Sequence, residues 1–334
     1  MKKLSLLLIG LFLVPTLFLT SCDKGDDPSD GSGTTTPAFS LMKDHMLANN
    51  LDINNIIVNA DGAKFVTAAP DEADLQAFLD SYYIMDIRSA ADFGSNHIEG
   101  ANNVPFANIL DEAPNAGGVP ILVVCYTGQT ACYGTALLRL SGYSSTQALK
   151  WGMSGWNSAT AGAWNGAIGD PAAGHANWDY ADATAAPVFG DPDLSSFSTD
   201  GEEILNNRIE QVIAEGFYGV AGVEVLDAPN NYYVNNYFNA TDYTGFGHID
   251  GAHRILEDLL LATNGYQGLD PDAGSVVTYC YTGQTSAVVT AWLRVLGYEA
   301  YSLKFGMNGL YNSNPAWVSN QWSSSVSKDL PLVN

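Results

Sequence analysis

The chain has 334 residues, of which 46% are hydrophobic and 11% aromatic, and this is enough apolar material for two ordinary domains with packed cores. The composition excludes a disordered or fibrous protein, since no low-complexity tract dominates it. The 36 acidic and 13 basic residues give a formal net charge of −23, and no Lys/Arg-rich stretch is present to bind phosphates, so we expect no nucleic-acid partner.

The N-terminus has the layout of a secretory signal. Two lysines precede an apolar run, residues 4–19, that is shorter than the roughly 20 residues of a comfortable membrane span. The run leads into Leu-Thr-Ser-Cys, which resembles a bacterial lipobox, in which the cysteine becomes the lipidated first residue of the mature protein. Residues 1–21 are therefore predicted to be a lipoprotein signal peptide, and residues 22–37 a lipid anchor and flexible tether.

Cys22 is the predicted lipidation site. Lipid on this residue would anchor an exported protein to a bacterial membrane, either on the periplasmic side or at the cell surface. The alternative, an incidental cysteine after an ordinary signal peptide, stays open.

The number of cysteines limits how they can pair. If Cys22 carries lipid, then Cys125, Cys132 and Cys280 remain, and three thiols cannot all form disulfides within one chain. At least one free thiol is therefore expected. In an oxidising compartment such a thiol is either buried and inert or placed for chemistry.

A hexapeptide, Cys-Tyr-Thr-Gly-Gln-Thr, occurs twice without change, at residues 125–130 and 280–285. An apolar, β-rich run precedes each copy, and a helical pattern that ends near a Gly-Tyr pair follows each copy. The runs are residues 121–124 and 276–279, and the helical segments are residues 131–140 and 286–296. A repeat with a period of about 150 residues indicates a duplicated domain, not a solenoid.

Each copy alternates short apolar strands with helical segments, which predicts an α/β fold with a parallel sheet flanked by helices. The two domains are expected at residues 38–165 and 201–334, with a connector at residues 166–200. In such sheets the reactive site lies beyond the carboxyl ends of the strands, where both hexapeptides stand. Thr130 and Thr285 are candidates for capping the helices that follow.

Aromatic residues in the connector indicate that this segment is packed, not free. They are Trp178, Tyr180 and Phe189, and we expect them to lie across the first domain.

Further motifs surround the first hexapeptide. They are Asp86-Ile87-Arg88, Asp92-Phe93, the His-Ile-Glu-Gly-Ala run at residues 97–101, Val104-Pro105 and Gly152-Met153. Together with the six-residue loop they resemble the rhodanese family, the tandem-domain sulfurtransferases. The resemblance covers residues 82–156 in the first copy and residues 232–310 in the second, and it implies two tandem rhodanese-like domains.

The resemblance also implies a sulfurtransferase of the thiosulfate/3-mercaptopyruvate type. Cys125 and Cys280 would take a sulfane sulfur from a small donor, such as thiosulfate or polysulfide, and hold it as a persulfide. A thiol or a cyanide-like acceptor would then remove it. No cofactor is implied, and no metal is expected, because the histidines and cysteines are not at the spacing of metal ligands.

The chemistry of such a loop requires a thiolate, and a free cysteine with a pKa of about 8.5 is mostly protonated at neutral pH. Neither loop contains Lys or Arg. Backbone N–H groups and the N-terminus of the following helix are therefore expected to form an anion cradle. The cradle residues are Tyr126, Thr127, Gly128, Gln129 and Thr130 in the first copy and Tyr281, Thr282, Gly283, Gln284 and Thr285 in the second. The side chains of Thr127, Gln129, Thr282 and Gln284 either hold substrate oxygens or neighbouring carbonyls, or they are solvated loop groups.

Two other classes of protein fit part of the pattern. Cysteine phosphatases share the strand, loop and helix, but they need an Arg six residues after the cysteine to grip phosphoryl oxygens. Ala131 and Ser286 occupy those positions here. A non-catalytic sulfur- or redox-sensing module could use the same loops as ligand cradles. The cysteine in both copies favours the enzyme, because a purely structural duplicate needs no exposed thiol.

The two sites are not expected to be equal. Asp86, Arg88 and Asp92 are interpreted as supports of the first loop, with an Arg88–Asp92 contact available only in this copy. The second copy has Asn236 and Phe238 in place of Asp86 and Arg88. We therefore expect the first loop to be better supported.

Cys132 follows the first loop directly, and its counterpart in the second copy is Ala287. We interpret Cys132 as a small buried residue, the alternative being a resolving thiol in the first copy. His97 and His248 precede glycines in a turn and are interpreted as anchors of that turn, not as acid–base catalysts.

Overall fold

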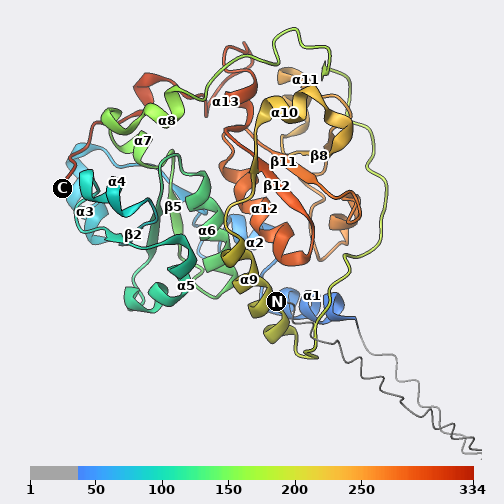
Figure 1. Cartoon of the computed structure of the whole chain (residues 1–334), viewed down its shortest axis with the longest axis horizontal. Coiled ribbons are helices and arrows are strands. Elements are labelled where there is room, and N and C mark those ends of the chain that lie inside the picture. The colour runs from blue at the N-terminus through green and yellow to red at the C-terminus, as the bar shows by residue number, and fades with distance from the viewer. Residues whose placement is uncertain (1–36) are drawn as a thin grey trace, which may run out of the picture. The chain divides into compact units, whose positions relative to one another are not determined.

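The computed structural model describes residues 37–334 (Figure 1). Cys22 lies outside these residues together with the signal peptide, so lipidation and export stay predictions. Within residues 37–334, no helix has the length and apolar character that a membrane crossing needs.

The helices divide between the two halves of the chain. In the first half they are α1 (Ala38–Ala48), α2 (Ile53–Ile57), α3 (Leu75–Asp80), α4 (Ala90–Ser95), α5 (Ile109–Glu112), α6 (Gln129–Leu140), α7 (Met153–Trp156) and α8 (Gly162–Asn165). In the second half they are α9 (Gly201–Glu215), α10 (Gly222–Asp227), α11 (Ala240–Phe246), α12 (Gln284–Leu296) and α13 (Gly306–Leu310). Short 3₁₀ helices are η1 (Glu72–Asp74), η2 (Phe106–Asn108), η3 (Ala113–Ala116), η4 (Ser158–Thr160), η5 (Pro229–Asn231), η6 (Gly265–Gly268) and η7 (Ser324–Val326).

The first half forms a five-stranded parallel sheet in the order β1-β5-β4-β2-β3. Its strands are β1 (Val66–Thr67), β2 (Tyr83–Asp86), β3 (Asn102–Asn103), β4 (Ile121–Val124) and β5 (Gln147–Leu149). All four residues of β4 are buried, which is why this strand has a continuous apolar sequence and not an alternating one.

The second half repeats this topology in the order β10-β8-β11-β12-β7, which is the same arrangement counted from the opposite edge. Its strands are β7 (Gly219–Val220), β8 (Tyr233–Asn236), β10 (His253–Arg254), β11 (Val276–Tyr279) and β12 (Ala300–Leu303). Two parallel sheets flanked by helices therefore follow one another in the chain, and the predicted α/β duplication is confirmed (Figure 1).

The helices after the two loops begin earlier than the sequence pattern indicated. Their N-caps are Gly128 and Gly283, with φ of 85° and 74°, and neither helix has a side-chain cap. The prediction that Thr130 and Thr285 cap these helices is therefore wrong. Glycine accepts the left-handed conformation at no steric cost. Each helix therefore begins at the glutamine directly after the glycine, and both threonines fall within its first turn.

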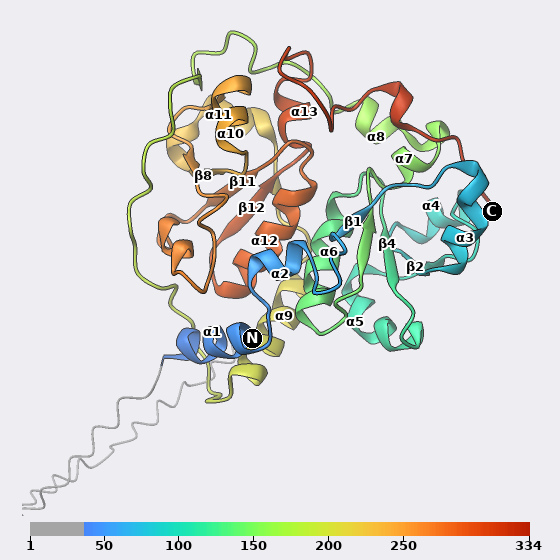
Figure 2. The ribbon, with the colours of Figure 1, turned by 180° about the vertical axis from the view of Figure 1, so that it is seen from behind.

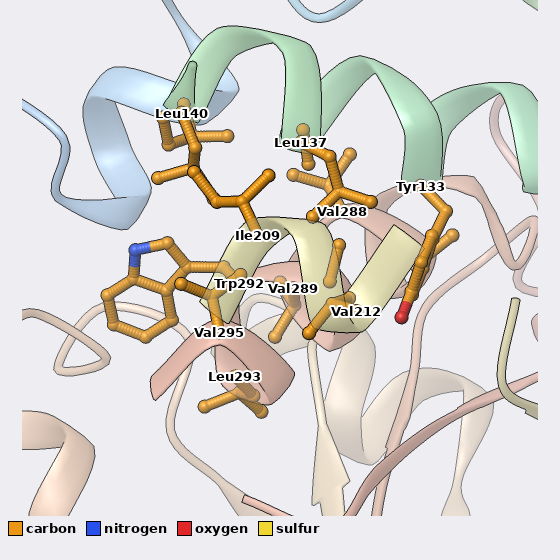
Figure 3. Close-up of a cluster of buried hydrophobic side chains, with 14 of the residues drawn as sticks. Tyr133, Leu137, Leu140, Ile209, Val212, Val288, Val289, Trp292, Leu293 and Val295 are labelled. Atoms are coloured by element: carbon orange, nitrogen blue, oxygen red, sulfur yellow. The ribbon is translucent and has the colours of Figure 1, made fainter. Parts of the chain in front are cut away.

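One hydrophobic core joins the two halves. Helices α6 and α12 lie side by side with α9 against them, and Leu137 of α6 faces Val288 of α12 (Figure 3). Trp292 lies in the same cluster, and its indole N–H donates to the Leu51 carbonyl. Almost every residue of α6 and α12 is buried, since each helix contacts its own sheet on one side and the other copy on the other.

Both ends of the described chain cross to the other copy. Helix α1 packs against α9, and α2 lies against α12 as well as α6 (Figure 2). At the other end, Val333 pairs with His97, and the Trp156 indole donates to the Pro331 carbonyl. The first segment of residues 37–334 thus packs against the second domain, and the last segment packs against the first domain. The domain boundaries stay a prediction.

The connector packs against the second domain, not the first. Trp178 begins β6 (Trp178–Asp179), which pairs antiparallel with β9 (His248–Ile249), and its indole donates to the Phe246 carbonyl. The ring of Phe189 lies edge-on to Tyr233, with centroids 5.7 Å apart. Tyr180 is exposed. The expected packing across the first domain is therefore wrong, because β6 pairs with β9 of the second domain in a separate two-stranded sheet.

Candidate active site

The two hexapeptide loops stand at the carboxyl ends of β4 and β11, each between its strand and the following helix. Both cysteines are buried, Cys125 being 4% exposed and Cys280 1%. A repeated Gly-Met pair supports each loop from below: Met153 donates its N–H to the Cys125 carbonyl (2.8 Å) and Met307 to the Cys280 carbonyl (2.9 Å). A Cβ at Gly152 would lie 2.4 Å from the Cys125 oxygen, so only glycine permits this approach.

Backbone N–H groups point at both sulfur atoms. Gly128 and Ala131 donate to Cys125 Sγ at 3.1 and 3.3 Å, and Ser286 donates to Cys280 Sγ at 3.3 Å. An anion formed at either sulfur would thus meet donors already aimed at it, two in the first loop and one in the second.

The first thiol is nevertheless hard to ionise. Burial raises the pKa of Cys125, and the nearby Asp86 charge raises it further, although N–H groups of Ala131, Thr127 and Gly128 oppose the increase. Desolvation therefore outweighs the backbone donors in this closed arrangement. The balance of these contributions favours the neutral thiol of Cys125.

The second loop contains a hydroxyl that sequence reasoning did not assign to the site. The Cys280 thiol donates to Ser286 Oγ at 3.6 Å, and this hydroxyl is bonded to Ser302 Oγ at 2.8 Å. The first loop has Ala131 at the position of Ser286. A polar residue in the first helical turn after a loop cysteine was the available signal.

A tyrosine–aspartate hydrogen bond occurs at the mouth of both loops. The Tyr126 hydroxyl donates to Asp92 Oδ2, and the Tyr281 hydroxyl donates to Asp242 Oδ2, each at 2.5 Å. Hydrogen bonds from Ser89 and Tyr126 lower the pKa of Asp92. Each loop is therefore tied to the helix that follows β2 or β8, α4 or α11, through a carboxylate.

Arg88 pairs with Asp86, not with Asp92. Its Nη2 lies 2.6 Å from Asp86 Oδ2 and also donates to the Asn96 carbonyl, and both members of the pair are buried. The expected Arg88–Asp92 contact is thus a misassignment, because Asp92 instead accepts from Ser89 and Tyr126. The buried Arg88 guanidinium therefore finds its hydrogen-bond partners nearby in the chain, at Asp86 and Asn96.

The second loop has a support of its own in place of this ion pair. Asn236 Oδ1 accepts the Phe238 N–H at 2.9 Å, and the Phe238 ring stacks on Tyr281 with centroids 4.6 Å apart. The second loop is therefore supported as well, by other residues than those expected at the first. The relative activity of the two sites stays a prediction.

The remaining loop side chains point inward more than the sequence indicated. Thr127 Oγ1 accepts from Gln129 Nε2 at 3.1 Å, and Thr282 Oγ1 accepts the Gln284 N–H at 3.2 Å. Gln129 and Gln284 are almost fully buried, whereas Thr130 and Thr285 are half-buried. The glutamines are thus structural groups of the loops and not solvated ones.

A cavity of about 270 Å³ opens beside the second loop. The residues that line it are Asn239, Asp242, Phe246, Tyr281, Ala316, Val318, Ser319 and Asn320. Lys150 of the first domain donates to Asn320, a residue of this wall, at 2.8 Å. A further cavity lies at the opposite end of the first sheet, next to Pro120 and Ile121, so it is remote from the sulfur of Cys125.

The third cysteine is buried within the shared core. Cys132 is fully buried beside α12, and burial raises its pKa well above the ordinary value. Cys125, Cys132 and Cys280 are all free thiols in the structure. The interpretation of Cys132 as a small buried residue agrees with this placement. Residues 37–334 hold no cluster of acidic, histidine and cysteine side chains suited to a metal ion.

Fold and site together define a duplicated α/β protein with a cysteine loop at the end of a central parallel strand in each copy. The rhodanese-like domain family model matches residues 70–159 and residues 235–313, about half of the chain. The chain therefore belongs to the rhodanese-like family, and each matched region contains one of the two loops.

Curated relatives resemble single domains of this chain. Thiosulfate sulfurtransferase GlpE of Pseudomonas entomophila is 29% identical over 101 residues, which cover 30% of this chain and 92% of the relative. The protein of the same name from Shewanella oneidensis is 33% identical over 84 residues, covering 24% of this chain and 81% of the relative.

Solved structures are more distant. A thiosulfate sulfurtransferase from Pseudomonas aeruginosa is 15% identical with a TM-score of 0.27, and the match covers 84% of this chain. This chain spans 49% of the length of that protein.

Proposed function

We propose that this protein is a sulfurtransferase that carries a sulfane sulfur as a persulfide on Cys125, on Cys280 or on both. Membership of the rhodanese-like family and the similarity to proteins named thiosulfate sulfurtransferase support the class of reaction. The observation that carries the proposal is the repeated geometry, an unpaired cysteine sulfur faced by backbone N–H groups at the N-terminus of a helix.

The reaction would proceed in two displacements at sulfur. The cysteine releases its proton to solvent, and its thiolate attacks the sulfane sulfur of the donor, so that an S–S bond forms to the enzyme and the donor's own S–S bond breaks. The leaving group, sulfite from thiosulfate or a thiolate from a persulfide, departs with the electron pair. An acceptor thiolate or cyanide then attacks the outer sulfur, and the cysteine thiolate leaves with the pair of the broken bond.

The N–H groups would stabilise negative charge in both steps. Gly128 and Ala131 donate to the first sulfur, and Ser286 donates to the second. Charge on the outer sulfur of a persulfide would extend toward the loop mouth, where Tyr126 and Tyr281 stand.

The preferred donors would carry little negative charge. The chain has a net charge of −23, and Arg88, which follows β2, is neutralised by Asp86. The carboxylates Asp92 and Asp242 lie at the loop mouths. Small persulfides and polysulfides of low charge would therefore be used more readily than the thiosulfate dianion.

One observation favours the alternative, a sulfur- or redox-sensing binding module. Cys125 and Cys280 are almost fully buried, and the pKa of Cys125 is raised, which is unusual for a nucleophile that must meet a donor. Such a module would take up sulfur slowly or not at all and would not release it to an acceptor.

Intact-mass analysis separates these two functions. The purified protein would be exposed to thiosulfate, polysulfide or 3-mercaptopyruvate, and an enzyme would gain one sulfur per reactive cysteine. Cyanide should remove this sulfur as thiocyanate. The Cys125→Ser/Cys280→Ser double variant should gain none, whereas Cys132→Ala should still gain sulfur. Absence of any cyanide-labile sulfur with every donor would contradict the enzyme.

The location of the protein is also a proposal. Export and anchoring through lipid on Cys22 would place both domains outside the cytoplasm.

A further inference from the structure

Gln129 and Gln284 occupy the same position in the two loops, and each reaches the loop of the other copy. Gln129 Oε1 accepts the Phe305 N–H at 2.7 Å, and Gln284 Nε2 donates to the Thr127 carbonyl at 3.2 Å. The two side chains are 3% and 2% exposed. These hydrogen bonds are therefore shielded from water and join residues more than 150 positions apart.

The approach is close enough to shape both loops. A Cβ at Gly128 would lie 2.6 Å from Gln284 Nε2, and a Cβ at Gly283 would lie 2.4 Å from Gln129 Oε1. Each glutamine thus lies directly on the glycine of the opposite loop. Any side chain at either glycine would displace the partner's glutamine.

The residues contacted in this way hold the cysteines. Gly128 donates its N–H to Cys125 Sγ, so Gln284 lies against a group that faces the first sulfur. Phe305 directly precedes the Gly-Met pair that supports the Cys280 carbonyl, so Gln129 holds the segment beneath the second sulfur.

The arrangement follows from how the two copies associate. Helices α6 and α12 pack side by side (Figure 3). Gln129 and Gln284 are the first residues of these helices. Their N-terminal turns therefore meet where the loops begin. Trp164 donates its indole N–H to the Thr127 carbonyl at 3.1 Å, so this oxygen accepts one bond from each half of the chain.

We propose that Gln129 and Gln284 are reciprocal positioning residues, each of which holds the backbone around the cysteine of the other domain. The reactivity of Cys125 then depends on Gln284, and that of Cys280 depends on Gln129. An effect of these glutamines on sulfur transfer rests on the proposed function. Their effect on the reactivity of the two thiols does not depend on it. In this way the two loops form one unit instead of two independent sites.

Gln284 provides the cleaner test, because its side chain bonds only to the first loop, whereas Gln129 also bonds to Thr127 of its own loop. Gln284→Met keeps the length of the side chain and removes the hydrogen bond without adding charge. The N–H of Gly128 would then be aimed less well at the sulfur. We expect the alkylation profile of Cys125 to move to higher pH by about 0.3 to 1 unit, a two- to tenfold change at fixed pH.

The readout is the rate of alkylation of each cysteine against pH, with a small neutral reagent and separate quantification of the two cysteine peptides by mass spectrometry. Cys280 in the Gln284→Met protein serves as the internal control and should change less than about twofold. Gln129→Met should give the mirror result, with the larger change at Cys280. Gln76→Met, the same substitution on the exposed helix α3, is the matched control and should change neither thiol.

Three results would overturn the proposal. The alkylation rate could change only at the cysteine in the glutamine's own domain, it could change equally at both cysteines, or it could stay the same in a folded variant. If the variants do not fold, hydrogen exchange of the unmodified protein decides. The Phe305 amide should exchange slowly, because its partner is Gln129, and rapid exchange would contradict the contact. A cross-domain effect on alkylation without any sulfur uptake would leave the inference intact and refute the proposed function.

Discussion

Phe238 stacks on Tyr281, with ring centroids 4.6 Å apart and planes 15° from parallel. In the first copy Arg88 takes the place of Phe238, and its guanidinium carbon lies 5.9 Å from the centre of the Tyr126 ring. An aromatic pair in one copy thus replaces a buried ion pair in the other. Both tyrosines bond to an aspartate, so the two loops share their geometry while their electrostatic surroundings differ.

The first prediction concerns the two nucleophiles. Two backbone N–H groups donate to Cys125 Sγ, whereas one donates to Cys280 Sγ, so negative charge on the first sulfur meets one more donor. We expect Cys125→Ser to remove more sulfurtransferase activity than Cys280→Ser, and the double variant to remove all of it. Initial rates with a polysulfide donor and a thiol acceptor measure this order. Equal losses, or a larger loss at Cys280, would reverse the ranking.

The second prediction concerns the hydroxyl in the second loop. Ser286→Ala removes the acceptor of the Cys280 thiol proton and makes the loop resemble the first one, which has Ala131. The Cys280 thiol then has no hydroxyl to accept its proton, so the rate of Cys280 alkylation near neutral pH should rise about two- to fivefold. Ala131→Ser is the matched converse and should slow Cys125. A Ser286→Ala protein with slower Cys280 would mean that the hydroxyl donates to the thiolate.

The third prediction concerns stability at alkaline pH. Burial raises the pKa of Cys132 well above its ordinary value of 9.0, so this thiol ionises in the unfolded chain first. Stability from the neutral thiol is then complete below pH 9.0 and is lost as the pH rises toward the folded pKa, by up to about 1.4 kcal/mol per pH unit.

Cys132→Ala removes this titration, and the second copy tolerates alanine at the same position, Ala287. The variant should be less stable by about 1 kcal/mol at pH 7 because of the smaller side chain. Denaturant unfolding at pH 7 and pH 10 should show that the difference in free energy of unfolding between the parent and the variant is smaller at pH 10. A difference that does not change with pH would mean that Cys132 titrates alike in the folded and unfolded chains.

The fourth prediction concerns charge. A net charge of −23 repels the thiosulfate dianion, and salt screens the repulsion over about 8 Å at physiological ionic strength. The initial rate with thiosulfate should rise from low to moderate salt, while a neutral donor is almost unaffected. Tyr126→Arg, at a side chain that is 41% exposed, should raise the thiosulfate rate several-fold, and Tyr126→Gln is the uncharged control. A thiosulfate rate that falls steeply with salt would indicate a cationic path to the sulfur.

The fifth prediction concerns the anchor. Cys22→Ser should abolish acylation and release the protein from membranes or leave it as an uncleaved precursor. Because residues 37–334 hold both cysteine loops, sulfur uptake by the protein should not change. Membrane fractionation and the mass of the mature protein give the answer. A Cys22→Ser protein that still partitions with membranes like the parent would contradict lipid anchoring.

The sequence alone determined the architecture, because the features that specify it are local. The repeated hexapeptide, the apolar run before each copy and the helical pattern after it predicted strand, loop and helix at residues 121–140 and 276–296. Local patterns were less reliable where a backbone turn decides the outcome. The left-handed conformation of Gly128, not a capping hydroxyl of Thr130, begins α6.

Only the tertiary structure decided which groups surround the sulfur atoms. No spacing in the sequence indicates that Gln129 bonds to Phe305 or that Gln284 bonds to Thr127, since these contacts depend on how α6 and α12 pack across the two copies. The packing results from burial of apolar faces, which is strong but has no preferred direction, so its consequences for polar groups at the helix ends emerge only once the two domains are in place.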